Sequence, residues 1–165
     1  MTDLQVLHKI FLFQDLEDDE LRRLLKLAYH TCHAEGQVIL QEGEPGDSMF
    51  IMVNGEVEIT KRLTLVLDED TPKERVMIRL KAEDGVTFGE MALLEDEVRS
   101  ATVTALTDCA LLEIKRDDFL AFIHENHLTA SKILLRLAQM LSRHLRKTNL
   151  DVVKLTTALA VALGG

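Results

Sequence analysis

Between His33 and Lys115 the chain breaks into short apolar runs separated by turn residues, and this pattern limits the available folds more than any other feature. Asn54-Gly55 separates two of the runs and is typical of a tight hairpin turn. The runs cover 38–40, 49–53, 56–60, 76–80, 101–105 and 110–114. Short strands with regular turns predict about seven or eight strands in a small antiparallel barrel or jelly roll.

Helical patterns flank this region on both sides. Apolar spacing predicts helices over the first thirty residues, with Ala28 in the second helix and with Asp15 and Asp18 as caps. After Lys115 a short helix is expected through Ile123, followed by a long one from Thr129 to Leu163. We therefore expect an α+β fold, an antiparallel β-roll flanked by N-terminal helices and a long C-terminal helix. Residues 1–127 form the roll with its first helices, and 128–165 form the closing helix of the same domain unit.

The long C-terminal helix carries a heptad seam. Its residues follow a 4-3 spacing: Leu141, Leu145, Thr148, Val152, Leu155, Leu159 and Ala162. A helix of ~35 residues extends ~50 Å, which is more than one small β domain covers. We expect a parallel homodimer through this helix, with Thr148 as the polar residue of the seam. The alternative is a helix that folds back onto the barrel.

Composition excludes several classes of protein. The net charge of −9 argues against nucleic-acid binding, which depends on neutralising phosphates, so the basic residues Arg143, Arg146 and Lys147 are interpreted as a solvated helix face. No apolar run approaches the ~20 residues of a membrane span. The first residues lack a basic patch leading into an apolar stretch. These features favour a cytoplasmic protein without membrane contact.

Residues 86–101 have the chemistry of an anion site. A single glycine, Gly89, leads from an expected strand into a short helical turn whose first amides have no internal partner. Arg99 follows and offers a planar fork of donors for phosphate oxygens, and Ser100 adds a hydroxyl and an amide. One cation beside free amides at the mouth of an apolar barrel suits a small monoanion with an apolar body.

Glu90 narrows the choice of ligand, since a carboxylate beside a phosphate must face another part of the molecule. A ribose 2′-hydroxyl is a donor that it can accept from. The competing interpretation makes Glu90 a helix-start residue and Arg99 half of a surface ion pair.

Together these residues resemble the cyclic-nucleotide-binding domain family. Its phosphate-binding cassette is similar to two stretches here, Phe88-Gly89-Glu90-Met91-Ala92-Leu93 and Arg99-Ser100-Ala101. The resemblance implies that Arg99 binds the cyclic phosphate, that Glu90 accepts the ribose 2′-hydroxyl, and that the amides of Ala92 and Ser100 complete the anion site.

The resemblance also implies where the base lies. Val76 and Ile78 would contact it from a strand. By alignment with bacterial activators of the family, Thr148 would contact the adenine amino group, and Asn149 would reach the ligand of the other subunit. Ser100, where cGMP-selective members often have threonine, favours cAMP over cGMP. Where those activators have two arginines, this chain has Arg143-His144, so a pairing with Glu90 is either pH-dependent or absent.

We therefore expect a regulatory cAMP sensor that couples ligand binding to movement of the dimerising helix, with an unidentified downstream partner. No enzyme is expected, because the six histidines do not fall into a metal-ligating or nucleophilic pattern. Since the sequence ends at Gly164-Gly165, no DNA-binding domain is expected after the helix. The alternatives are a degenerate, ligand-free interaction scaffold and a fragment of a larger transcription regulator.

Overall fold

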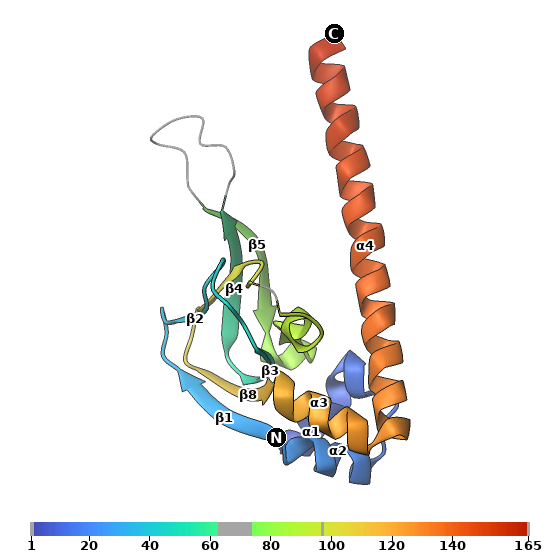
Figure 1. Ribbon diagram of the computed structural model, residues 1–165. Coiled ribbons are helices and arrows are strands. Elements are labelled where there is room, and N and C mark those ends of the chain that lie inside the picture. Colours follow the sequence, from blue (N-terminus) through green and yellow to red (C-terminus); the bar gives the residue numbers. More distant parts are fainter. Residues whose placement is uncertain (1, 63–73, 97, 165) are drawn as a thin grey trace.

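The computed structural model describes residues 2–62, 74–96 and 98–164 (Figure 1). Within these ranges, eight strands form two four-stranded antiparallel sheets, in the orders β1-β8-β3-β6 and β2-β7-β4-β5. The strands are β1 (Ala28–His33), β2 (Val38–Leu40), β3 (Ser48–Asn54), β4 (Glu56–Arg62), β5 (Glu74–Lys81), β6 (Thr87–Phe88), β7 (Thr102–Ala105) and β8 (Cys109–Lys115). The expected β-roll is therefore confirmed, and Gly55 supplies the positive φ of 99° between β3 and β4.

The N-terminal segment is helical only as far as residue 25. It comprises α1 (Asp3–Lys9), the 3₁₀ turn η1 (Phe11–Phe13) and α2 (Asp18–Leu25). The helix predicted through Ala28 is wrong, because β1 already begins at that residue and pairs with β8, Ala28 opposite Ile114. Lying at the edge of its sheet, β1 exposes residues such as Tyr29 and His30 and so lacks the apolar alternation that would have marked it as a strand.

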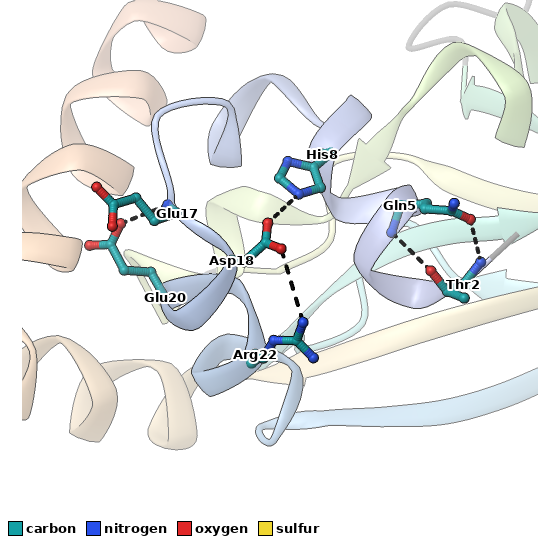
Figure 2. Close-up of polar contacts among 7 residues, drawn as sticks. All are labelled: Thr2, Gln5, His8, Glu17, Asp18, Glu20 and Arg22. Carbon is teal, nitrogen blue, oxygen red and sulfur yellow. Dashed lines mark hydrogen bonds and ion pairs between the residues drawn. The ribbon is translucent and has the colours of Figure 1, made fainter.

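The caps of the first helices also differ from the prediction. Thr2 and Gln5 form a capping box on α1, in which each backbone amide donates to the other side chain (Figure 2). Glu17, not Asp15 or Asp18, is the N-cap of α2, and its amide donates to the Glu20 carboxylate at 2.9 Å. Asp18 instead bonds His8 of α1 at 2.9 Å and so ties the two helices together (Figure 2).

Two apolar cores meet at β3 and β8. Met49 and Ile51 of β3 face the core beneath the helices, whereas Phe50 and Met52 face the interior of the roll. In β8, Leu112 faces the core beneath the helices and Leu111 faces the interior of the roll. Successive side chains of a strand point to opposite faces, so a strand covered on both sides is apolar throughout. These two strands join the helices to the roll.

The C-terminal part consists of α3 (Arg116–Glu125) and α4 (His127–Gly164). Two further 3₁₀ turns, η2 (Ala82–Asp84) and η3 (Glu90–Leu93), lie before and after β6, within the roll sequence. The first turns of α4 are buried through Thr129, Ala130, Ile133 and Leu137. From Ser142 onward every described residue of α4 is exposed, and the helix continues well past the roll (Figure 1). Among the described helices, α4 included, none combines the length and apolar character needed to cross a bilayer.

Glu20 anchors the start of α4 to α2. Glu20 is 6% exposed, and its carboxylate accepts hydrogen bonds from the Thr129 hydroxyl and the Lys132 ammonium, both at 2.7 Å. Burial alone would raise the pKa of Glu20, but the hydrogen bonds from Lys132, the Glu17 amide and Thr129 outweigh it and lower the pKa from 4.5 to about 2.

Glu20→Gln should lower the free energy of unfolding at pH 7 by about 1–3 kcal/mol, because charged hydrogen bonds are lost. A depressed folded-state pKa contributes stability above pH 4.5, and this stability is lost as the pH falls toward about 2. Urea unfolding at pH 7 and pH 3 should therefore show the gap between the variant and the wild type narrowing at the lower pH. Glu125→Gln, at the exposed end of α3, is the control. An equal gap at both pH values would contradict a role for the ionised carboxylate.

Candidate functional site

A cavity of about 430 Å³ opens between the roll, η3 and the middle of α4. Its roll side is apolar, with Leu40, Ile59, Leu80 and Val103 coming from β2, β4, β5 and β7. Its other side is formed by the residues around η1 and by Met140 and His144 of α4. The volume falls in the range of about 300–1,000 Å³ typical of small-molecule sites.

Arg99 supplies the buried cation of this cavity. Its side chain is 9% exposed, and its guanidinium donates to the Ser48 carbonyl oxygen at 2.7 Å and to the Ser48 hydroxyl at 3.2 Å. The backbone of Arg99 is held as well, since its amide donates to the Glu44 carbonyl and its carbonyl accepts from the Gly43 amide. Loop 43–46 and the start of β3 therefore fix the guanidinium on both sides.

Two glycines provide the space that the guanidinium occupies. A Cβ atom at Gly46 would lie 2.0 Å from Arg99 Nε, and one at Gly89 would lie 2.9 Å from a terminal guanidinium nitrogen. Gly89 also has a φ of 78°, which a larger residue rarely adopts. Both positions therefore require glycine for the cation to sit where it does.

The charge of Arg99 is only partly compensated. Burial lowers the pKa of its guanidinium, and the nearby carboxylates of Asp47 and Glu113 offset this in part. No carboxylate among the described residues lies within 4.0 Å of it, and the two bonds to Ser48 leave other N–H donors of the guanidinium available. The predicted alternative of a surface ion pair is therefore wrong. A buried cation in this state favours an anion at the cavity wall.

Glu90 and Ser100 lie on the same cavity wall as Arg99. Glu90 is the first residue of η3, directly after Gly89. Neither the amide nor the hydroxyl of Ser100 has an acceptor among the described residues. The wall thus presents a cation, a carboxylate and free donors to whatever fills the apolar space behind them.

His144 and Glu90 both line the cavity, yet no hydrogen bond or ion pair joins them in the described part of the chain. Of the two alternatives for this pair, a pH-dependent pairing or no contact, this arrangement shows no contact. The Ala92 amide, which the resemblance assigns to the anion site, donates to the Gly89 carbonyl at 3.2 Å as part of the 3₁₀ turn.

The structure brings most of the predicted site residues together. The cavity lining includes Ile78, Phe88, Gly89, Glu90, Met91, Ala92, Arg99, Ser100 and Ala101. Val76 is not part of it, because a register shift in the β4–β5 pairing falls between the Ile59–Ile78 pair and the Thr60–Val76 pair. Thr148 and Asn149 are not part of it either, because the lining contributed by α4 ends at His144.

Sequence reasoning missed the strand residues Leu40, Ile59, Leu80 and Val103 and two groups that lie further from the cassette in the chain. Gly46 and Ser48 position Arg99, and the turn sequence Gly46-Asp47-Ser48 gave no sign of this long-range contact. Ile10, Phe11 and Leu12 line the cavity from the N-terminal segment. Their signal was present, since the apolar run 10–13 is wider than one helix face and implies contacts on two sides.

Known proteins resemble this chain over most of its length. A cyclic AMP receptor protein from Thermus thermophilus is 30% identical over 141 residues, which cover 86% of this chain and 60% of that protein. Glutaminase 2 of Bradyrhizobium diazoefficiens is 33% identical over 141 residues, 86% of this chain but 20% of that protein. The chain thus spans between 14% and 62% of the length of the curated relatives that it matches here.

Solved structures of related proteins also superpose on this chain. The catabolite activator protein of Thermus thermophilus superposes with a TM-score of 0.77 and 28% identity, covering 88% of this chain and 63% of that one. The regulatory domain of Toxoplasma gondii PKA, crystallised with cAMP, superposes with a TM-score of 0.61 and 30% identity, covering 72% and 42%. The family model for the cyclic nucleotide-binding domain matches residues 32–126, more than half of the chain. This chain therefore belongs to the cyclic nucleotide-binding domain family.

Proposed function

We propose that this chain is a cAMP-binding regulatory module in which the ligand sets the position of α4. The observation that carries the proposal is Arg99, a buried cation without a carboxylate partner within 4.0 Å among the described residues, facing an apolar cavity beside Glu90. A cyclic phosphate would bond the remaining guanidinium donors, and Glu90 would accept the ribose 2′-hydroxyl. The base would enter the apolar space lined by Ile78 and Leu80.

The preference for cAMP rests on Ser100 and on relatives whose names or titles mention cAMP, among them the receptor of Thermus thermophilus and the Toxoplasma gondii domain. Other relatives are cGMP-dependent protein kinases of Caenorhabditis, so cGMP is the competing ligand.

A homodimer through α4 completes the proposal. The seam residues beyond Leu141 are exposed, Leu145 and Leu155 by 62% and 69%, and exposed apolar heptads are stabilised by a second helix. Thr148 and Asn149 do not line the cavity of their own chain. In a parallel pair of α4 helices, these two residues would approach the cavities of the dimer. Ligand and dimer would then stabilise each other.

Arg99→Ala should weaken cAMP binding by about tenfold or more, because a charge-assisted bond contributes about 1.5–3 kcal/mol. Calorimetric titration with cAMP and cGMP measures this, and the wild type should bind cAMP more tightly. Arg79→Ala is the matched control: Arg79 pairs with Glu58 on the surface of the same roll, outside the cavity. Unchanged affinity in Arg99→Ala would reject the assigned pocket, and a wild type that binds neither nucleotide would support the ligand-free scaffold instead.

Gly46→Ala should also weaken cAMP binding by about tenfold, since the new methyl group displaces the Arg99 guanidinium and misaligns its donors. Gly46 is not among the described glycines with positive φ, so alanine adds no backbone strain there. Gly36→Ala is the contrasting variant: Gly36 has a φ of 80° and open space around it. That change should reduce thermal stability and leave the affinity intact. Equal affinities for Gly46→Ala and the wild type would show that the placement of Arg99 does not depend on glycine at position 46.

Leu155→Lys should convert the dimer to a monomer, as measured by light scattering after size-exclusion chromatography, because a charge enters the apolar seam. Val153→Lys is the control, since Val153 is exposed to a similar extent but lies off the seam. Saturating cAMP should lower the dissociation constant of the wild-type dimer. A Leu155→Lys protein that stays dimeric would contradict an interface at this seam.

A further inference from the structure

We propose that Phe11 contacts the base of the bound nucleotide and sets how strongly the site prefers a purine. This inference rests on the proposed function, because it assigns part of the same ligand to a residue outside the cassette. Phe11 is partly buried in η1 and lines the cavity.

The position of the base follows from the polar end of the cavity. If the phosphate is bound by Arg99 and the ribose by Glu90, the base extends into the apolar remainder. That remainder has two walls, one of strand residues such as Ile78 and one formed by η1 and α4, with Phe11 and Met140. A planar base has two faces, so the strand wall covers one face and leaves the other to the helical wall.

Phe11 is the aromatic residue that the helical wall contributes to this lining. The other described aromatic in the lining, Phe88, is 4% exposed and stacks on Phe50 with ring centroids 5.5 Å apart. The ring of Phe88 is thus already part of the roll core. Aromatic contacts add selectivity for large flat groups beyond the burial of area alone.

The ring of Phe11 is held in place from α4. The Arg143 guanidinium lies 4.5 Å from its centroid and the Arg136 guanidinium 5.0 Å. Arg136 is itself fixed by two hydrogen bonds of 2.6 Å to the Asp15 carboxylate. These contacts place the ring before any ligand arrives, and a preorganised contact costs little ordering on binding.

Calorimetry on three ligands tests the proposal: cAMP, cyclic UMP, and ribose 3′,5′-cyclic phosphate, which has no base. Phe11→Ala should weaken cAMP binding by about tenfold, cyclic UMP by less, and the compound without a base not at all. Phe11→Leu keeps apolar volume and should lose only part of the cAMP affinity; it also serves if the alanine variant fails to fold. Tyr29→Leu is the control, because its ring also lies beneath a cation, Lys115 at 5.8 Å, but outside the cavity.

The outcomes separate the two proposals. A wild type that binds no cyclic nucleotide overturns the proposed function itself. A wild type that binds cAMP while both Phe11 variants bind it equally well overturns the role of Phe11 alone. Equal losses for cAMP and for the compound without a base also overturn that role, since the ring would then act through the fold rather than on the base.

Discussion

The two-sided burial of β3 is the constraint on which the rest of the structure depends. Its residues alternate between the core under the helices and the interior of the roll, so neither core is complete without it. The strand begins at Ser48, whose carbonyl and hydroxyl oxygens accept from Arg99. The packing that joins helices to roll therefore also fixes the partner of the buried cation. A shift of β3 by one residue would turn each of its side chains toward the opposite core, and it would also move Ser48 away from Arg99.

In the candidate site, the Arg99 guanidinium loses hydration and gains a fixed position. Burying a guanidinium that has no carboxylate partner among the described residues costs free energy, and the two bonds to Ser48 offset only part of that cost. Glycine at positions 46 and 89 lets the backbone close around the side chain, which excludes water from one side of the charge. An anion that completes the coordination therefore regains solvation that the folded protein has given up. This makes the affinity of the site depend on the fold around Arg99 as well as on Arg99 itself.

The sequence predicted those parts of the fold and site that depend on local pattern. Short runs with turn residues predicted the roll, and residues 88–92 and 99–101 predicted part of the cavity lining, because each stretch carries its own chemistry. It failed where the outcome depends on distant partners. An edge strand at Ala28 needs no apolar alternation, the lining role of Phe11 depends on where α4 passes, and the exclusion of Val76 depends on a register shift. None of these is encoded within a few residues.

The geometry of α4 determines what a ligand is able to change. Its first turns are fixed by Glu20 and by apolar burial, whereas from Ser142 onward every described residue of the helix is exposed. A ligand shifts a conformational equilibrium only by the difference between its affinities for the two states. Met140 and His144 line the cavity near the end of the buried part of α4, so under the proposed function a small movement there would tilt the exposed remainder of the helix. A rotation at that point displaces the distal seam most, so a second helix packed there would be the element most sensitive to ligand binding.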